Sequence, residues 1–430
     1  MAREKSPKAK GEKIVKQIAV IGSGIAGMAA AYYLSRRHVV TLYEKENRLG
    51  GHTHTVSVPT ESGVVGVDTG FIVHNDRTYP NLVRLLGELG VKTQASDMSF
   101  SVSCGRTGLE YSSRGANGFF AQRKNLLRLQ HLGLFKEILR FNRQATKLLA
   151  QPNHENITVG EYLERGRFSA AFRDFYLYPM ASAVWSTSLA KMSDFPAATL
   201  IRFFDNHGML SLHRQPKWKV LRGGSHSYIK PLTAPCRERI HTGVNLRSVH
   251  RQDYGVELQF GSGRSEWFDE VVLACHGNQA LSLLAKPTTA ELDVLKHFCT
   301  NRNETVLHTD ENLLSSNSRT RASWNYHLNG DHTGGVTMTY HMNRLQSLRV
   351  REQFCVTLNP NGHVRPEKVL RRLTYFHPLY TREAIGAQAR WSEISGKNRT
   401  HFCGAYWFYG FHEDGLNSAL RVASALGVDC

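Results

Sequence analysis

The sequence has 430 residues, of which 41% are hydrophobic, and it carries 54 Lys and Arg against 36 Asp and Glu. The length allows two or three domains with buried cores, and the composition is that of a globular protein without repeats or low-complexity blocks. The formal charge of +18 attracts polyanions, either nucleic acid or an anionic membrane face, unless it is only a solvated basic surface. No zinc-finger spacing or RNA-binding signature accompanies the charge, so nucleic acid is the weaker partner.

Cysteines and hydropathy predict a cytoplasmic protein. The seven cysteines are odd in number, contain no C-x-x-C pair and lie mostly in apolar surroundings, which predicts reduced core thiols. Residues 1–13 are lysine-rich and no apolar signal core follows them, so they predict a disordered basic tail. The chain has no run of about eighteen apolar residues, and any membrane contact is therefore expected to be peripheral, on the inner face.

The first predicted elements are a strand, a glycine turn, a helix and a second strand. Residues 17–21 are a short β-branched run, residues 25–36 read as an alanine-rich helix, and residues 38–43 return as a strand. A strand, a glycine-rich turn and a helix in this order are typical of dinucleotide binding.

The glycines of the turn have the spacing G-x-G-x-x-G. Gly22 allows the tight turn, Gly24 lets the backbone approach a pyrophosphate, and Gly27 lets the helix pack closely on its strand. The helix N-terminus offers unpaired N–H groups to the phosphates. Glu44 ends the second strand, where a carboxylate accepts hydrogen bonds from a ribose. Other candidate cofactor residues in the turn are Ser23, Ile25 and Ala26.

The segment after Glu44 distinguishes between dinucleotides. It carries an R-x-G-G motif, which resembles the extended fingerprint of FAD-binding oxidoreductases rather than that of NAD dehydrogenases. Arg48 can pair with a phosphate, while Gly50 and Gly51 let the backbone run along the cofactor. Lys45 and His52 are further cofactor candidates. No third ligand accompanies His52 and His54 at a recognisable spacing, so we expect no metal site.

The middle of the chain predicts a substrate domain. A helix at residues 79–89 and a hairpin at residues 99–112 precede a helical region from residue 124 to about residue 206. This region is rich in aromatic residues, and we expect it to cap the active site, with Trp185 lining the ligand cavity. Packing in the core is the alternative role for these aromatic side chains.

The remaining strands are expected to complete two sheets. Strands at residues 246–250, 256–260 and 270–274 are expected to return the chain to the nucleotide-binding sheet. Residues 304–374 are strand-rich and predict an antiparallel sheet behind the substrate. A strand at residues 400–403 then leads into the last helix.

With both ends in view, the chain resembles the flavin-containing amine oxidase superfamily, which includes protoporphyrinogen oxidase and the phytoene desaturases. The likeness lies in the fingerprint with Arg48 to Gly51, the Gly223-Gly224 helix start, the strands near Leu246, and the segment from Phe402 to Gly415. More narrowly, DTGFIVHN, TYHMN and YWFYGFHEDGL resemble a bacterial branch associated with cyclopropane-synthase-like methyltransferases. One subgroup of this branch is implicated in desaturating methyl-branched acyl chains on the way to furan fatty acids.

The resemblance implies an α/β fold with a Rossmann-like FAD-binding domain and an α+β substrate domain that carries the helical insertion and the antiparallel sheet. The FAD-binding domain would comprise residues 14–75, 220–285 and 390–430, and the substrate domain residues 76–219 and 286–389. FAD is the implied cofactor. Beyond the fingerprint, the resemblance assigns to cofactor contacts the backbone of Leu246, Gly404, and Gly415 with Leu416, which would begin the last helix with its N-terminus facing the flavin.

The sequence also departs from the family. The C-terminal E-G-A-x-x-S-G pattern is altered at residues 414–419, and the lysine that bridges to flavin through water in amine oxidases has no identifiable counterpart, which weighs against amine oxidation. Some relatives attach flavin to a C-terminal cysteine, but for Cys403 a buried free thiol is the favoured state.

The chemistry argued from these residues is hydride removal from a substrate carbon. No second G-x-G-x-x-G for NADPH is evident, which favours an oxidase or desaturase over a reductase. Desaturation also needs a base, and the candidates are His412 and Glu413, followed by His341 and His327. Trp407 and Tyr409 are expected to form an aromatic wall beside the flavin, with packing as the alternative.

The expected substrate is an apolar chain, such as the methyl-branched acyl chain of a phospholipid, held at an anionic membrane surface. One alternative is a soluble oxidase of amines or amino acids, which predicts a polar pocket. Another alternative is a non-catalytic flavoprotein that positions a lipid or a lipid methyltransferase partner.

Overall fold

The structure is a computed structural model that describes residues 14–152, 154, 157–185, 189–211, 215–328 and 337–430. The predicted basic tail, residues 1–13, lies outside the described residues. The mixed α/β class predicted from the sequence is confirmed. No helix within the described ranges is both long and apolar enough to cross a bilayer.

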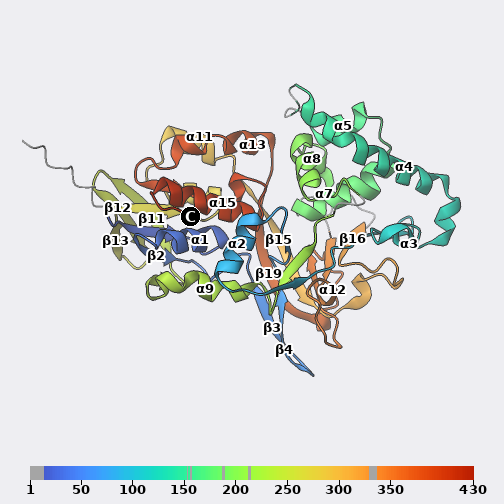
Figure 1. The fold of residues 1–430 in the computed structure, drawn as a ribbon, viewed down its shortest axis with the longest axis horizontal. Coiled ribbons are helices and arrows are strands. Elements are labelled where there is room, and N and C mark those ends of the chain that lie inside the picture. The colour runs from blue at the N-terminus through green and yellow to red at the C-terminus, as the bar shows by residue number, and fades with distance from the viewer. Residues whose placement is uncertain (1–13, 153, 155–156, 186–188, 212–214, 329–336) are drawn as a thin grey trace, which may run out of the picture.

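A five-stranded parallel sheet organises one end of the molecule (Figure 1). Its strand order is β10-β2-β1-β14-β20, and every neighbouring pair is parallel. The strands are β1 (Gln17–Ile21), β2 (Val39–Tyr43), β10 (Ile240–His241), β14 (Glu270–Leu273) and β20 (Thr400–Phe402). Segments far apart in the sequence therefore meet in this sheet, and all five strands fall within the three ranges expected for the cofactor domain.

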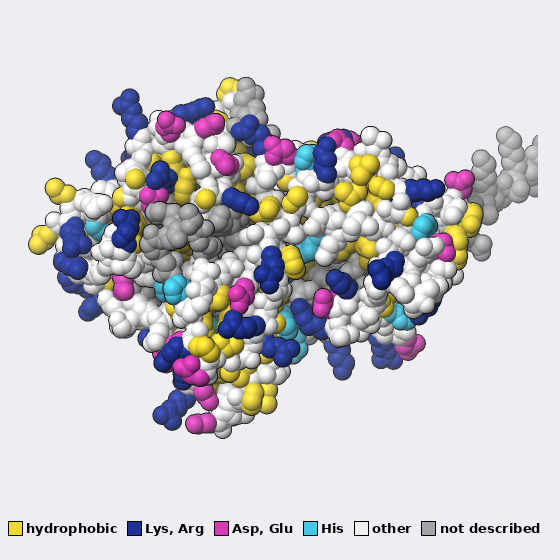
Figure 2. Space-filling view, turned by 180° about the vertical axis from the view of Figure 1, so that it is seen from behind, with side chains coloured by type: hydrophobic (Ala, Val, Ile, Leu, Met, Phe, Trp, Pro, Cys, Tyr) yellow, Lys and Arg dark blue, Asp and Glu magenta, His cyan; other side chains and the backbone are white. Residues whose placement is uncertain are grey.

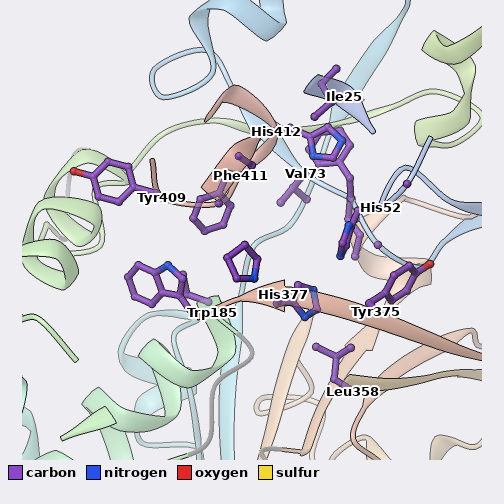
Figure 3. Close-up of a pocket in the computed structure, with 18 of the residues that line it drawn as sticks. Ile25, His52, Val73, Trp185, Leu358, Tyr375, His377, Tyr409, Phe411 and His412 are labelled. Carbon is purple, nitrogen blue, oxygen red and sulfur yellow. The ribbon is translucent and has the colours of Figure 1, made fainter. Parts of the chain in front are cut away.

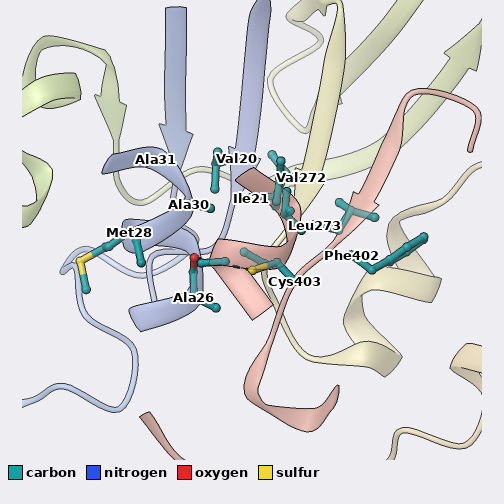
Figure 4. Close-up of a cluster of buried hydrophobic side chains, with 14 of the residues drawn as sticks. Val20, Ile21, Ala26, Met28, Ala30, Ala31, Val272, Leu273, Phe402 and Cys403 are labelled. Atoms are coloured by element: carbon teal, nitrogen blue, oxygen red, sulfur yellow. Dashed lines mark hydrogen bonds between the residues drawn. The ribbon is translucent and has the colours of Figure 1, made fainter. Parts of the chain in front are cut away.

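Two helices pack together beside this sheet, α1 (Ile25–Leu34) and α15 (His412–Ala425). Ala29, Ala30 and Ala31 are fully buried, and their small side chains allow α1 to approach its neighbours closely. Figure 4 shows this core, where Ala30 of α1 lies beside Val20, and Val272, Leu273 and Phe402 follow on the neighbouring strands. The first helix and the last are thus parts of one core.

Two expected strands do not join the parallel sheet, contrary to the prediction. β11 (Leu246–Gln252) and β12 (Gly255–Phe260) form a separate antiparallel sheet with β13 (Ser265–Phe268), a strand that the sequence analysis missed. Buried Val249, Val256 and Leu258 face the core, whereas many of their neighbours are partly exposed. This one-sided burial suits an antiparallel sheet and not a central parallel one.

A seven-stranded sheet supports the rest of the chain, in the order β19-β15-β18-β17-β16-β7-β8. The strands predicted within residues 304–374 pair antiparallel, as expected, and the sheet is extended because β16 pairs in parallel with β7 of the hairpin. The strands are β7 (Phe100–Cys104), β8 (Leu109–Ser112), β15 (Thr300–His308), β16 (Trp324–Leu328), β17 (Thr337–His341), β18 (Cys355–Leu358) and β19 (Val369–Pro378). β7 and β8 form the predicted hairpin.

A helical region projects from this sheet at the end opposite α1 and α15 (Figure 1). It comprises α3 (Gly115–Phe119), the 3₁₀ helix η1 (Arg123–Leu127), α4 (Leu129–Gln144), α5 (Val159–Arg165), α6 (Ala170–Phe172), α7 (Tyr178–Trp185) and α8 (Ala197–Asn206). Its buried aromatic side chains, such as Phe141, Phe172 and Phe204, form a second hydrophobic core with residues of the seven-stranded sheet. The predicted helical insertion is therefore present.

Smaller elements connect these parts. The strands are β3 (Thr55–Thr60) paired with β4 (Gly63–Asp68), and β5 (His74–Asn75) and β6 (Thr93–Ala95) on either side of β9 (Trp218–Leu221). The helices are α2 (Pro80–Glu88), α9 (Ile229–Thr233), α10 (Gly277–Leu283), α11 (Thr289–Leu295), α12 (Met342–Leu345), α13 (Arg382–Gln388) and α14 (Trp391–Ile394).

The buried carboxylate of Asp68 joins three of these segments. It accepts hydrogen bonds from Thr55 Oγ1 at 2.5 Å, from Ser225 N at 2.8 Å and from Gln346 Nε2 at 3.0 Å. Burial raises the pKa of Asp68 to about 6. The β3–β4 hairpin, the turn before α9 and the helix α12 therefore depend on one fully buried acceptor.

We predict that Asp68→Ala lowers the free energy of unfolding by about 3 kcal/mol or more, because it leaves several buried donors without an acceptor. The measurement is urea denaturation of both proteins. The matched control is Asp76→Ala, which removes an exposed carboxylate paired with Lys219 and should cost about 1 kcal/mol or less. Equal effects of the two substitutions would contradict the role of Asp68.

Candidate active site

A single cavity of about 1930 Å³ runs from the glycine turn to the helical insertion. One end is lined by the turn and by residues 43–48 and 50–52, the middle by residues 69–73, 371–378, 404–406 and 409–412, and the other end by α3, α4 and α7. The cavity therefore passes from the parallel sheet, along β19, into the aromatic region (Figure 3).

The glycine turn has no room for side chains where α1 meets β1. A Cβ atom on Gly27 would lie 1.8 Å from the carbonyl oxygen of Gly22, and Gly22 itself has a φ of +104°. Gly24 differs, because a Cβ atom there would meet no protein atom within 4 Å and Gly24 lines the cavity. Gly27 is thus required by helix packing, whereas Gly24 leaves space for a ligand.

The carboxylate of Glu44 is held at the end of β2. Its Oε2 atom accepts hydrogen bonds from Ser23 N at 2.8 Å and Ser23 Oγ at 2.6 Å, and its Oε1 atom accepts one from Glu46 N at 2.9 Å. A carboxylate has about four acceptor positions, so one remains for a ligand hydroxyl. Lys45 follows it on the exposed rim of the cavity.

Arg48 and His52 present buried polar atoms at this end of the cavity. Arg48 Nη2 donates to the carbonyl oxygen of Gly51 at 2.9 Å, whereas Arg48 Nη1 is buried and has no protein partner. His52 Nε2 is also buried without a protein partner. A buried guanidinium N–H without an acceptor is costly and suits an anionic ligand such as phosphate.

Of the other predicted cofactor residues, some line the cavity and some lie outside it. Ile25, Ala26, Gly50, Leu246 and Gly404 line the cavity. Gly415 and Leu416 do not, and α15 begins at His412 instead of at Gly415. Leu416 is fully buried, and a Cβ atom on Gly415 would lie 2.7 Å from Ile25 Cγ2, so these two residues serve the packing of α15 on α1.

His412 lines the cavity but is engaged in the protein. Its Nε2 atom lies 2.9 Å from Thr53 Oγ1 and 3.2 Å from the Tyr228 hydroxyl, and its ring stacks on Phe71 at 3.6 Å. Burial lowers the pKa of His412 to about 3, so the imidazole is neutral. His412 therefore positions Thr53 and Phe71.

The predicted bases Glu413, His327 and His341 all lie outside the cavity, so none of them can take a proton from a substrate bound there. Glu413 accepts hydrogen bonds from Asn81 N and Leu82 N at 3.0 and 2.9 Å, which satisfies the N-terminal amides of α2. His327 Nδ1 lies 2.9 Å from Ser103 Oγ, and His341 Nε2 lies 2.8 Å from Gln353 Oε1. His327 and His341 lie on strands, as predicted, but alternation along a strand cannot show which face borders a cavity.

Of the three aromatic residues predicted to lie beside the ligand, two line the cavity and one does not. Trp185 and Tyr409 line the cavity, as Figure 3 shows. Trp407 lies outside it, fully buried and packed on Phe298 with ring centroids 4.7 Å apart. Cys403 is a buried free thiol whose Sγ lies 3.7 Å from the carbonyl oxygen of Ala26 (Figure 4), and burial raises its pKa to about 12.

The sequence analysis missed several lining residues, among them Phe71, His207, Tyr375, His377 and Phe411. Figure 3 shows Phe411, His377 and Tyr375 around the same space as His412 and His52. Phe71 and Phe411 lie within the DTGFIVHN and YWFYGFHEDGL motifs of the family resemblance, so the sequence did hold a signal that could have identified these two residues. The other three carried no local pattern, because the fold alone brings α8 and β19 to the cavity.

Burial lowers the pKa of His377 and of His207 to about 4, and lowers that of His52 well below its usual range. For His52 the neighbouring imidazoles of His377 and His276 add to this effect. The histidines of the cavity are consequently neutral. No group of three or more His, Cys, Asp or Glu side chains in the described part of the chain is arranged to hold a metal ion.

Residues 25–427 match the flavin containing amine oxidoreductases. The chain belongs to this family. It is a flavin-dependent oxidoreductase, and its cofactor is a flavin. No curated protein sequence matches the chain.

Solved structures share the fold across nearly the whole chain. A fatty acid isomerase from P. acnes that produces CLA has a TM-score of 0.71 at 16% identity, with 96% of this chain and 99% of that one covered. A putative protoporphyrinogen oxidase from Exiguobacterium sp. 255-15 has a TM-score of 0.68 at 17% identity, with 96% and 99% covered. A cyclohexylamine oxidase from Brevibacterium oxydans IH-35A has a TM-score of 0.64 at 13% identity, again with 96% and 99% covered.

The residues of the cavity fit FAD. The open space above Gly24 and the unpaired Arg48 Nη1 suit the diphosphate, beside the first turn of α1. The remaining acceptor position of Glu44 suits a ribose hydroxyl. The size of the cavity leaves room for a substrate beyond the cofactor, since its far end continues into the helical insertion.

We predict opposite behaviour for two glycine substitutions. Gly24→Ala should leave the stability of the apoprotein within about 1 kcal/mol of wild type, because its Cβ meets no protein atom, but should abolish FAD retention by filling the space for the diphosphate. Gly27→Ala should lose both stability and FAD, because α1 must move away from β1. The measurements are urea denaturation of the apoproteins and flavin absorbance after gel filtration. An FAD-loaded Gly24→Ala protein would contradict the assignment.

Proposed function

We propose that the protein oxidises the acyl chain of a lipid, introducing a double bond next to an existing double bond or methyl branch. The observation that carries this proposal is the apolar far end of the cavity. It is lined by aromatic and aliphatic side chains from the helical insertion and from the seven-stranded sheet, including Phe119, Phe135, Ile138, Met180, Val184, Trp185, Trp324, Tyr340 and Leu358.

The charged side chains among the described lining residues lie away from this apolar end. Among the lining residues that the structure describes, the carboxylates are Glu44 and Glu46, both beside the glycine turn. The arginines are Arg48, in the diphosphate segment, and Arg371 and Arg372, both exposed on β19. An alkylammonium or amino-acid substrate would bury a charge and needs a partner for it. The cavity therefore favours an uncharged chain over the amine and amino-acid alternatives.

Desaturation removes a hydride from one carbon and a proton from its neighbour. Bound FAD supplies the two-electron acceptor for the hydride. Loss of hydride beside a double bond leaves an allylic cation, whose neighbouring C–H is strongly acidic, so a weak neutral base is sufficient. The apolar walls exclude water, which would otherwise add to the cation.

His207 is the base that we propose. Its Nδ1 atom donates a hydrogen bond to the carbonyl oxygen of Phe203 at 2.9 Å, which leaves Nε2 as the acceptor. The ring is held by stacking on Phe203, with centroids 3.8 Å apart, and lies 6.0 Å from the Phe411 ring. His377 is less suitable because its Nδ1 accepts from Asn303 Nδ2 at 2.9 Å, which leaves its Nε2 carrying the proton.

The test is anaerobic reduction of the purified holoenzyme, followed as bleaching of flavin absorbance. We predict that unsaturated or methyl-branched phospholipids and fatty acids bleach the flavin, whereas putrescine, cyclohexylamine and amino acids do not. Ile138→Glu, which places a charge at the apolar end, should slow bleaching by lipid at least about 100-fold while FAD remains bound. Bleaching by amines alone would contradict the proposal.

His207→Ala should reduce the rate constant of bleaching by about 10² to 10⁴, the usual contribution of a general base. Because the folded pKa of His207 is lowered to about 4, the imidazole is already neutral above pH 5, and the wild-type rate should not change between pH 6 and pH 9. The rate should fall only as the pH approaches 4. A wild-type rate that rises with a pKa near 7 would assign the proton to another group.

A further inference from the structure

The tip of the helical insertion exposes a group of large apolar side chains to solvent. Along η1 and the start of α4, the exposed fraction is 47% for Leu126, 88% for Leu127, 85% for Leu129, 39% for Leu132 and 36% for Phe135. We call these five residues the leucine tip. Single exposed apolar residues are ordinary, but a contiguous group on one surface marks an interaction site.

Basic side chains surround the leucine tip. Residues 114–147 contain Arg114, Arg123, Lys124, Arg128, Lys136, Arg140, Arg143 and Lys147 but only one acidic residue, Glu137. That carboxylate is engaged, since it accepts hydrogen bonds from Ser169 N at 2.9 Å and Arg140 Nη2 at 3.3 Å. Figure 2 shows yellow and dark blue side chains together at the left edge, where this end of the molecule lies.

The leucine tip is continuous with the substrate end of the cavity. Leu129, Leu132, Phe135 and Ile138 follow one another at three-residue intervals on α4, so successive side chains are neighbours in a row that winds around the helix. Their exposed fractions fall from 85% to 39%, 36% and 7%. Phe135 and Ile138 line the cavity. An apolar track therefore leads from the protein surface to the apolar end of the cavity.

We propose that the leucine tip inserts into an anionic lipid bilayer and that acyl chains enter the cavity along this track. Exposed leucines flanked by Lys and Arg match the acyl and headgroup layers of such a membrane. A soluble protein partner would have to be acidic as well as apolar, and a second copy of this chain would bring two basic surfaces together. The bilayer is the partner that satisfies both the apolar and the charged features. The entry route rests on the proposed function, whereas membrane binding does not.

The experiment is flotation of the FAD-loaded full-length protein with vesicles of phosphatidylcholine alone or with 30% phosphatidylglycerol. We expect binding to the anionic vesicles and at least tenfold weaker binding to the neutral ones. Leu127→Asp/Leu129→Asp should reduce binding to anionic vesicles at least tenfold, and Lys124→Glu/Arg128→Glu should do the same. The matched control is Val64→Asp/Leu292→Asp, which introduces two charges at exposed apolar positions outside the leucine tip, on β4 and α11. This variant should bind anionic vesicles as wild type does.

Each outcome decides the proposal. Absence of wild-type binding to anionic vesicles, or equal loss in the control variant, would overturn it. Unchanged vesicle binding by Leu127→Asp/Leu129→Asp would also overturn it, and loss of a dimer in gel filtration would then assign the surface to a second copy. Flavin bleaching by monomeric short-chain fatty acid should be unchanged in this variant, whereas bleaching by vesicle lipid should fall at least tenfold. If no lipid bleaches any variant, the proposed function fails while the vesicle-binding result still stands.

Discussion

The contact between Gly27 on α1 and the carbonyl oxygen of Gly22 is the constraint on which the rest of the structure depends. A Cβ atom at position 27 would lie 1.8 Å from that oxygen, so only glycine lets α1 start directly above the end of β1. The first turn of α1 then faces the cavity with unpaired amides, beside the open space at Gly24. Because α15 packs on α1, the same contact fixes where the last helix begins and hence where Phe411 and His412 stand.

Buried polar residues hold distant segments against this cofactor site. Asp68 joins the β3–β4 hairpin to the turn before α9 and to α12, and His412 joins the C-terminal helix to Thr53, Tyr228 and Phe71. Asp68 and His412 both stabilise the packing of distant segments, although Asp and His are residue types that often act as acids or bases in catalysis. Their role follows from the number of protein partners each one has.

The sequence predicted the fold well where local chemistry determines it and poorly where tertiary contacts do. The glycine turn, Glu44 and the Arg48 segment were predicted as cofactor residues because binding a phosphate, binding a ribose or a close backbone approach requires these residue types. All three line the same end of the cavity. The strands β11 and β12 were assigned to the wrong sheet, since their alternating burial depends on partners that the sequence does not reveal. His327 and His341 were placed on the correct strands but on the wrong face, and His207 was missed because only the fold brings α8 to the cavity.

The most direct test of the central claim is a crystal structure of the purified protein with its bound cofactor. The account predicts one FAD per chain, with the diphosphate at Gly24 and Arg48, the ribose at Glu44 and the ring system reaching the segment from Gly404 to His412. A purified protein without flavin, or one that holds only a nicotinamide dinucleotide in this cavity, would contradict it.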